Sequence, residues 1–282
     1  MSESIYTLRV SRAAAGAYPT ISDALAAADQ LYPDAEQPVT IHIEPGEYRE
    51  RVEIHRPYVT LVGETADSVR IVGSLGAKMP SGDGSGIDGK LGTFRTYTVL
   101  VDADDVRLEN LTIVNDAGDG REVGQAIALY ADGDRLVVDA CCITGRQDTL
   151  FLGPLPPREV KPGGFIGPKQ FAPRRVGRQY FRRCRIEGDV DFIFGGACAY
   201  FEGCEIRSLN RDMDVNGHVT AAAPPQRGAV RICVSWLFVY SSGWRGAGFG
   251  LPGPSLARMG ANCADRLLAG TTYQARRLVG LE

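Results

Sequence analysis

Two aspartates occupy the same position in two related segments and could form a catalytic pair. Asp148 lies five residues after Ile143, and Asp191 lies five residues after Ile186. If the segments belong to neighbouring coils, equivalent positions are about 4.8 Å apart. Two carboxylates this close cannot both ionise freely, so the pKa of one rises while that of the other stays low. One could then act as acid and base and the other as nucleophile, although either aspartate alone is typical of a turn.

Amide and aromatic side chains accompany the two aspartates. Gln147 directly precedes Asp148, and Gln125 lies near the equivalent place one coil earlier. Neutral amide donors suit a developing oxyanion, because they neither repel nor neutralise adjacent carboxylates. Phe192 and Phe194 follow the second aspartate and could form a wall on which a sugar stacks. Phe192 could equally be a core residue, because side chains along a strand alternate between two faces.

The residues around these candidates repeat along the chain. Four eight-residue segments align without gaps, each with an apolar third residue and a closing isoleucine: 106–113, 136–143, 179–186 and 199–206. Their isoleucines are 30, 43 and 20 residues apart. Without residues 153–176, which contain six prolines, the second spacing is close to one coil, so we interpret that segment as an inserted loop. Repeats of this length indicate a solenoid whose coils bury their apolar faces against one another.

Strand signals dominate the rest of the sequence. Short apolar runs bounded by Gly, Asp and Asn predict strands at 40–43, 59–62, 98–101 and 126–129. One helical pattern stands out near the start, with Thr20 or Ser22 as the cap. Its apolar face contains Ile21, Leu25 and Ala28 and reaches Leu31. This placement predicts a helix that covers the end of the β structure.

Composition narrows the class of protein. The 282 residues are 44% hydrophobic and 23% charged with a net charge of −3, which is typical of a soluble protein. There is no basic excess for nucleic acid, and a polyanionic partner would need local basic groups. No run of about 20 apolar residues predicts a membrane span. The first residues lack a signal-peptide pattern, so the chain as written is expected in the cytoplasm, and its seven cysteines suggest free buried thiols rather than a metal site.

Four ordered segments carry a resemblance to a known family. Residues 46–50, 124–129, 145–151 and 188–195 resemble the signature segments of the pectin methylesterases, and the likeness runs from about Tyr6 to Ala223. The resemblance implies a single-stranded right-handed parallel β-helix that acts as a monomer without metal or cofactor. The implied substrate is methyl-esterified polygalacturonate, that is pectin or its oligomers, and the implied product is methanol.

The same resemblance implies roles for individual residues. Asp191 would attack the ester carbonyl to form an acyl-enzyme, and Asp148 would protonate the departing methanol and then activate water. Gln125 and Gln147 would stabilise the oxyanion. The remaining implied substrate contacts are Thr93 and Phe194.

The end of the chain departs from the family. After residues 220–225 the strand repeat is no longer evident, and the family segment Leu-Gly-Arg-Pro-Trp, whose arginine pairs with the nucleophile, is missing. If residues 251–258 are back-translated and the reading frame is shifted forward by one nucleotide, the codons permit Tyr-Leu-Gly-Arg-Pro-Trp-Arg-Ala. The same shift permits three further segments that resemble the family, and all four occur in the order found in the family. We infer a one-nucleotide frameshift between about Ala223 and Val230. The expected organisation is an esterase-like β-helix over 1–225 and an atypical tail over 226–282.

Two other functions compete with an esterase. Without the arginine, the chain could be a catalytically impaired β-solenoid that binds polygalacturonate. A polysaccharide lyase on the same fold would need carboxylate clusters for calcium and a basic proton abstractor, and no such cluster is evident in the sequence. Methanol release would distinguish an esterase from both alternatives.

Overall fold

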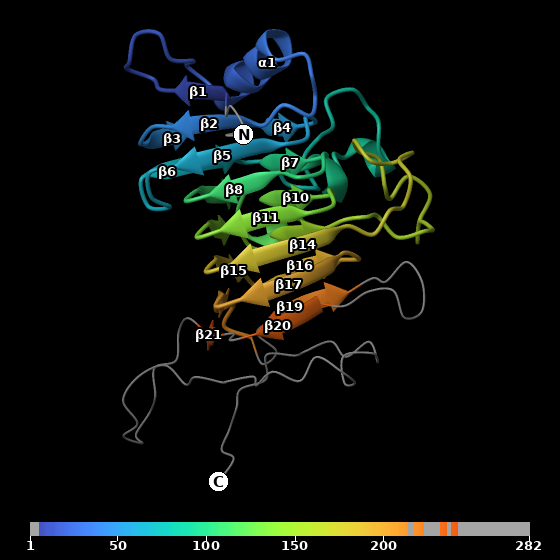
Figure 1. Cartoon of the computed structure of the whole chain (residues 1–282). Helices are drawn as coiled ribbons and strands as arrows, with labels where there is room; N and C mark the ends of the chain where they lie inside the picture. Colours follow the sequence, from blue (N-terminus) through green and yellow to red (C-terminus); the bar gives the residue numbers. More distant parts are fainter. Residues whose placement is uncertain (1–5, 214–216, 223–231, 236–237, 242–282) are drawn as a thin grey trace, which may run out of the picture.

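The strands of the protein form three parallel sheets along a stack of coils (Figure 1). The computed structural model describes residues 6–213, 217–222, 232–235 and 238–241. Each complete coil adds one strand to each sheet, and every strand pair is parallel. This arrangement confirms the predicted right-handed parallel β-helix.

The first sheet has eight strands. In spatial order they are β1 (Tyr6–Val10), β2 (Val39–Ile43), β5 (Val59–Gly63), β8 (Arg107–Glu109), β11 (Leu136–Asp139), β14 (Arg178–Arg182), β17 (Cys198–Glu202) and β20 (Ile232–Ser235).

The second sheet has six strands and carries the candidate site. In spatial order they are β4 (Val52–Ile54), β7 (Val99–Val101), β10 (Leu129–Ala131), β13 (Leu150–Leu152), β16 (Val190–Gly195) and β19 (His218–Ala222).

The third sheet has seven strands. In spatial order they are β3 (Gly46–Tyr48), β6 (Val69–Gly73), β9 (Thr112–Asn115), β12 (Cys142–Thr144), β15 (Arg185–Gly188), β18 (Glu205–Ser208) and β21 (Phe238–Ser241).

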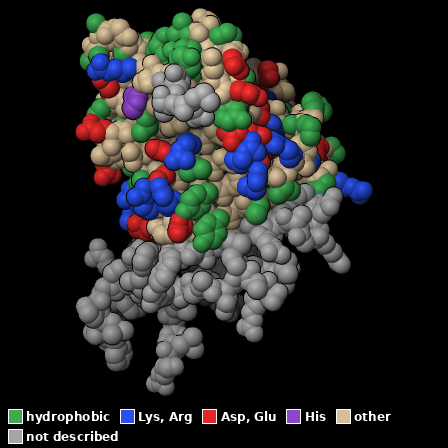
Figure 2. All heavy atoms as spheres, in the orientation of Figure 1, with side chains coloured by type: hydrophobic (Ala, Val, Ile, Leu, Met, Phe, Trp, Pro, Cys, Tyr) green, Lys and Arg blue, Asp and Glu red, His purple; other side chains and the backbone are tan. Residues whose placement is uncertain are grey.

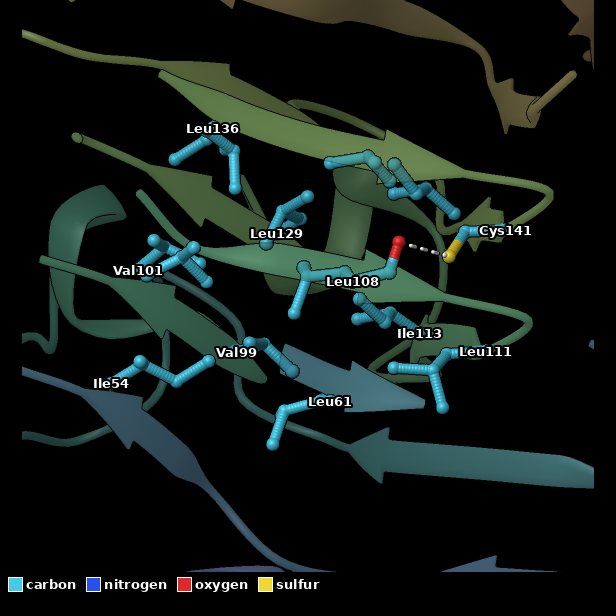
Figure 3. Close-up of a cluster of buried hydrophobic side chains, with 14 of the residues drawn as sticks. Ile54, Leu61, Val99, Val101, Leu108, Leu111, Ile113, Leu129, Leu136 and Cys141 are labelled. Carbon is cyan, nitrogen blue, oxygen red and sulfur yellow. Dashed lines mark hydrogen bonds between the residues drawn. The ribbon is translucent and has the colours of Figure 1, made fainter. Parts of the chain in front are cut away.

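The repeat seen in the sequence sets the register of the coils. The closing isoleucines are direct neighbours in the third sheet, where Ile143 pairs with both Ile113 and Ile186 and Ile186 pairs with Ile206. All four are buried and belong to one interior core. Figure 3 shows part of this core, in which side chains from successive coils point inward and contact one another. Each coil therefore buries its apolar face against its neighbours, as expected for a solenoid.

Aromatic and thiol side chains complete the interior. The rings of Phe181 and Phe201, in the third position of two repeats, stack with centroids 4.7 Å apart and planes 10° apart. The Cys141 thiol donates to the carbonyl of Leu108 at 3.4 Å (Figure 3). Of the cysteines in the described residues, Cys141, Cys142, Cys184 and Cys204 are buried and free, and Cys198 is free but only partly buried.

The helix α1 (Ile21–Leu31) covers the first coils, as predicted (Figure 1). Thr20 is its N-cap and accepts from the backbone N–H of Asp23. The carboxylate of Glu50 accepts from the N–H groups of Ile21 and Ser22 at 2.9 and 3.0 Å. These contacts satisfy donors that the first turn of a helix leaves unpaired. The apolar face of α1 is thereby fixed over β1, β2 and β4.

Charged side chains cover the outside of the coils in mixed clusters. In the face shown in Figure 2, basic side chains lie beside acidic ones. Asp134, for example, accepts from Arg178 at 2.6 Å and from Arg135 at 2.7 Å. Much of the basic charge is therefore paired within the protein, in keeping with the small net charge.

Two segments of the structure bear on the organisation expected from the sequence. Residues 153–176 connect β13 to β14 and contain no helix or strand, in keeping with an inserted loop. The strand repeat was expected to end near Pro225, but β20 and β21 pair in parallel with β17 and β18 beyond this point. That part of the expectation was wrong, because two short apolar runs that lack a closing isoleucine still add strands to the first and third sheets. The proposed frameshift point and most of the tail lie outside the described residues.

Candidate active site

The two aspartates lie next to each other in adjacent coils. Leu150 pairs with Ile193, which places Asp148, two residues before β13, opposite Asp191 in β16. The backbone N–H of Asp148 donates to the carbonyl of Val190 at 3.0 Å, which holds the two coils in this register. The shared offset from the isoleucines therefore brings the two carboxyl groups together on one side of the second sheet.

Both aspartates have a left-handed backbone conformation. The φ angle is 62° at Asp148 and 50° at Asp191. This region is unfavourable for most residues, but aspartate and asparagine tolerate it better than others. The chain turns here from the third sheet into the second, so the two residues stand at equivalent corners. Such conformations often occur at functional sites, where the surrounding structure holds them in place.

Burial and charge separate the environments of the two carboxyl groups. Burial raises the pKa of Asp148 well above its usual range, and the charge of Asp191 raises it further, while a hydrogen bond from Gln147 lowers it. Asp191 is only half-buried, and burial raises its pKa while the charge of His218 lowers it. The pKa values of both carboxyl groups are therefore raised, that of Asp148 more strongly, and the expectation that one of them stays low is wrong because burial acts on both. Asp148 has the environment of a proton carrier, and Asp191 is the more accessible of the two carboxyl groups.

The two glutamines lie in the coils beside the aspartates. The N–H of Ala126 donates to the carbonyl of Gln147 at 3.0 Å, so Gln125 and Gln147 are neighbours across two coils. The side chain of Gln147 also lies against Gly120, in the short helix α2 (Gly120–Val123), where a Cβ atom would come within 2.5 Å of its Oε1. The structure therefore places Gln125 and Gln147 at equivalent positions of neighbouring coils, and the Gln147 side chain hydrogen-bonds to Asp148.

A buried asparagine positions the loop that carries Thr93. The Nδ2 of Asn115 lies 2.9 to 3.0 Å from the carbonyl oxygens of Leu75, Thr96 and Ile127. Thr93 begins the short helix η2 (Thr93–Arg95), next to a turn that includes η1 (Ile87–Gly89), and its carbonyl accepts from the hydroxyl of Thr96. Asn115 thus ties this loop to the coils of the site.

Phe194 belongs to an aromatic cluster on the outer face of the second sheet. Its ring centroid is 4.8 Å from that of Phe151 and 6.4 Å from that of Phe94. Phe165, from the inserted loop, contacts Phe94 at 5.6 Å. Phe94, Phe151 and Phe165 are buried, whereas Phe194 is only partly buried. Phe194 is therefore the partly exposed member of this cluster, three residues after Asp191, while Phe192 lies in the interior core and cannot form a wall.

Sequence reasoning missed the contacts that hold the turn before Asp191. The Nε of Arg146 lies 2.8 Å from a carboxylate oxygen of Asp189, which is 1% exposed. The other carboxylate oxygen of Asp189 accepts from the N–H of Val190 at 2.8 Å. Arg146 directly precedes Gln147, so one buried ion pair links the corners that carry both aspartates. No local signal in the sequence pairs these residues, because they are 43 residues apart.

The inserted loop is fastened by a second ion-pair cluster. Lys169 pairs with Asp102, and its Nζ lies 3.8 Å from the carboxylate of Asp132. Arg174 donates to four backbone carbonyls of the loop. Burial raises the pKa of Asp132 to about 6, and the charge of Lys169 opposes this shift. These contacts hold Phe165 over the aromatic cluster.

Neither a metal centre nor a membrane helix emerges from the part of the chain that the structure describes. Within it, no group of three or more His, Cys, Asp or Glu side chains is arranged to hold a metal ion. None of its helices is both long and apolar enough to span a bilayer.

Comparison with known proteins connects this geometry to one family. The model of the family described as Pectinesterase matches residues 7–154 and 174–229, so the match omits most of the inserted loop. The chain is 34% identical over 193 residues to the Arabidopsis thaliana protein named "Probable pectinesterase/pectinesterase inhibitor 23", covering 68% of this chain and 28% of that protein. It is 34% identical over 210 residues to "Probable pectinesterase A" of Aspergillus oryzae, covering 73% of this chain and 52% of that protein. The chain thus spans about a quarter to a half of these relatives.

Solved structures show the same architecture. Pectin methylesterase PemA from Erwinia chrysanthemi superposes with a TM-score of 0.68 at 28% identity, covering 85% of this chain and 67% of that one. A pectin methylesterase in complex with a hexasaccharide gives the same values. The pectin methylesterase from carrot has a TM-score of 0.62 at 27% identity, covering 83% of this chain and 63% of that one.

Proposed function

Because the chain belongs to the pectinesterase family, we propose that it hydrolyses the methyl esters of galacturonate units in pectin and releases methanol. The adjacent carboxyl groups of Asp148 and Asp191 carry this proposal. Asp148 is buried and its pKa is strongly raised, whereas Asp191 is only half-buried, which supports a proton donor and an accessible carboxyl group in adjacent coils. An aspartate nucleophile with an aspartic acid partner needs no metal or cofactor.

The proposed reaction has two halves. A carboxylate oxygen of Asp191 attacks the ester carbonyl carbon, and the amides of Gln125 and Gln147 stabilise the negative oxygen that forms. The bond to the methoxy group breaks, the methoxy oxygen takes the proton of Asp148, and methanol leaves an acyl-enzyme on Asp191. Asp148, now ionised, removes a proton from water, which attacks the acyl carbon and releases the Asp191 carboxylate.

Two residues are proposed to contact the sugar. The partly exposed ring of Phe194 offers an apolar face beside Asp191, and Thr93 stands on the loop that packs over the same cluster. Sugars have apolar faces that suit aromatic rings, and the half-buried Phe194 is the member of the cluster that remains available. We propose pectin or methylated oligogalacturonate as the bound substrate of a monomeric enzyme.

We propose that residues 1–225 form the esterase-like unit with the inserted loop 153–176, and that 226–282 are not native family sequence. The described strands β20 and β21 lie beyond residue 225, so this proposed boundary does not coincide with the last strand. Resequencing the DNA around codons 223–230 would test the frameshift.

The missing Leu-Gly-Arg-Pro-Trp segment favours one alternative. A chain without this segment could bind polygalacturonate but turn over poorly. Methanol release from methyl-esterified polygalacturonate, measured with binding to the same polymer, distinguishes the two functions. Binding without methanol would support the impaired solenoid, and a product that absorbs in the ultraviolet would indicate a lyase.

Variants test the roles of the aspartates. Asp191→Asn should abolish methanol release, because an amide is a poor nucleophile. Asp148→Asn should lower it by about 10²–10⁴-fold, as for other general acid-base groups. Asp88→Asn is a matched control, because Asp88 also has a left-handed φ angle of 55° but is exposed in another loop. If the control retains activity and Asp191→Asn keeps normal turnover, the assignment is wrong.

A further inference from the structure

The ladder of the two glutamines continues through the next coils. Gln147 is followed across the coil boundary by Val190, because the N–H of Asp148 donates to the Val190 carbonyl. Val190 in turn pairs with His218, whose N–H donates to the carbonyl of Asp189 at 3.1 Å. His218 is the first residue of β19. One line of equivalent positions therefore runs from Gln125 through Gln147 to His218.

The Asp191 corner lies between the glutamines and this histidine. The register of β16 and β19 shifts between Val190 and Ile193, so Asp191 stands in an irregular stretch directly beside the start of β19. Asp148 is its neighbour in the preceding coil, and in the following coil His218 lies opposite Val190, the residue directly before Asp191. An acid of one coil and a histidine of the next therefore lie on either side of the Asp191 corner.

The imidazole is not committed to any other group that the structure describes. Its Nδ1 is buried and has no hydrogen-bond partner among the described residues. Two acidic residues adjoin it: Asp189, whose backbone carbonyl accepts from the N–H of His218, and Asp191, on whose carboxyl group the charge of the imidazole acts. Asp189 is already paired with Arg146, and burial raises the pKa of Asp148 well above its usual range. The charge of the imidazole acts on Asp191, where it lowers the pKa against the effect of burial.

We propose that His218 is a positioning residue that holds the Asp191 carboxylate ionised and oriented for attack. The proposal rests on the proposed esterase function, in which Asp191 is the nucleophile. A positive charge on the imidazole favours the charged form of a neighbouring carboxylate and attracts that carboxylate electrostatically. A buried, unpartnered nitrogen would otherwise be costly, and pairing with Asp191 or with a water beside it removes that cost.

Loss of this cation should move the titration of Asp191. In His218→Gln the carboxyl group keeps its burial but loses the opposing charge, so its pKa should rise by about one unit, at the low end of the range for such pairs. The acid limb of the kcat/KM profile should move to higher pH by the same amount. At pH values on that limb, methanol release should fall about tenfold, because the ionised nucleophile becomes correspondingly rarer. KM should change little, since His218 is not proposed to contact substrate.

The experiment uses the full chain and two matched variants. His218→Lys keeps a positive charge and should hold the acid limb at or below its wild-type position. His42→Gln removes an exposed histidine of β2 and should leave the profile unchanged. The carboxyl ¹³C shift of Asp191, assigned with Asp191→Asn, gives its titration midpoint without requiring any activity. If His218→Gln perturbs folding, the titration midpoint of Asp191 in His218→Lys, compared with that in the wild type, still tests the effect of charge.

The outcomes separate this inference from the proposed function. A raised Asp191 midpoint in His218→Gln, restored by lysine, supports the pair even if no methanol is released. The inference would be overturned if the titration midpoint of Asp191 is unchanged in well-folded His218→Gln. It would also be overturned if His218→Lys raises this midpoint as much as His218→Gln does. Absence of methanol release by the wild-type chain would count against the esterase function and would leave the measured carboxyl titration intact as a test of the pair.

Discussion

Replacement of Asp132 by asparagine should change how the stability of the protein depends on pH. Asp132 follows β10 beneath the inserted loop, and its side chain is 10% exposed. Its pKa is raised from 3.8 to about 6, mainly by burial; the charge of Lys169 opposes this shift and the charge of Asp102 adds to it. Its carboxylate also faces Gly153 closely, since a Cβ atom there would lie 2.5 Å from it. The site therefore favours the neutral acid.

The sign and size of the effect follow from proton linkage. Between pH 3.8 and about 6 the unfolded chain loses this proton while the folded protein keeps it, so stability falls as pH rises. Above about pH 6 the folded protein carries the full cost of an ionised Asp132. A shift of about two pKa units corresponds to about 3 kcal/mol. Asp132→Asn cannot ionise, so its free energy of unfolding relative to wild type should rise by up to about 3 kcal/mol from pH 3.5 to pH 6.5.

Urea unfolding followed by circular dichroism at several pH values measures this difference. The difference between variant and wild type removes the contributions of the other carboxyl groups. Asp104→Asn is an informative control, because the hydrogen bonds from Arg175 are the largest cause that lowers the pKa of Asp104. Its effect should have the opposite sign: the Asp104 pair stabilises above the unfolded pKa, and that stabilisation is lost as pH falls.

A second variant tests the role of the loop lysine. Lys169→Met removes the largest cause that lowers the pKa of Asp132. The variant should therefore lose stability on ionisation of Asp132 over a higher pH range than the wild type does. If the stability of Asp132→Asn relative to wild type is the same at pH 4 and pH 7, Asp132 does not titrate as a buried acid. The ion-pair cluster beneath the inserted loop would then need another explanation.

Three further predictions concern stability. Phe201→Ala should cost about 3–5 kcal/mol in urea unfolding because it empties a stacked core position, whereas Tyr200→Ala, its exposed neighbour, should cost far less. Gly195→Ala should lower the free energy of unfolding by about 1–3 kcal/mol, because φ is 120° and a Cβ atom would lie 2.2 Å from the Leu152 carbonyl; equal stability would contradict this conformation. Glu50→Ala should cost about 1–2 kcal/mol by freeing the first N–H groups of α1, and an unchanged melting curve would rule out that cap.

Much of the coil register was predictable because the interior imposes it. An apolar residue at a fixed place in every coil must meet its equivalent in the next, so the aligned isoleucines became direct neighbours. The same rule placed Asp148 beside Asp191. The cap of α1 was predictable because the side chain of Thr20 and the N–H that it binds are three residues apart.

Other features depend on contacts that local patterns do not encode. Phe192 and Phe194 could not be told apart, since the irregular register of β16 breaks simple alternation. The contact of Phe94 with Phe165 joins two loops that are 71 residues apart. His218 escaped notice because it does not follow an aligned isoleucine at the offset that identified the aspartates. The strands β20 and β21 were missed because their short apolar runs lack the closing isoleucine of the repeat.

The backbone ladder makes the spacing of functional groups discrete. Side chains at the position of Gln125, Gln147, Val190 and His218 can be displaced along the helix axis only in whole steps of one strand spacing, about 4.8 Å. A substitution at Val190 would therefore insert a new group between amide and imidazole without moving either. A substitution at one such position changes the functional group of one coil and leaves the spacing of the others unchanged. The chemistry of this face can therefore be altered by single substitutions, without reshaping loops.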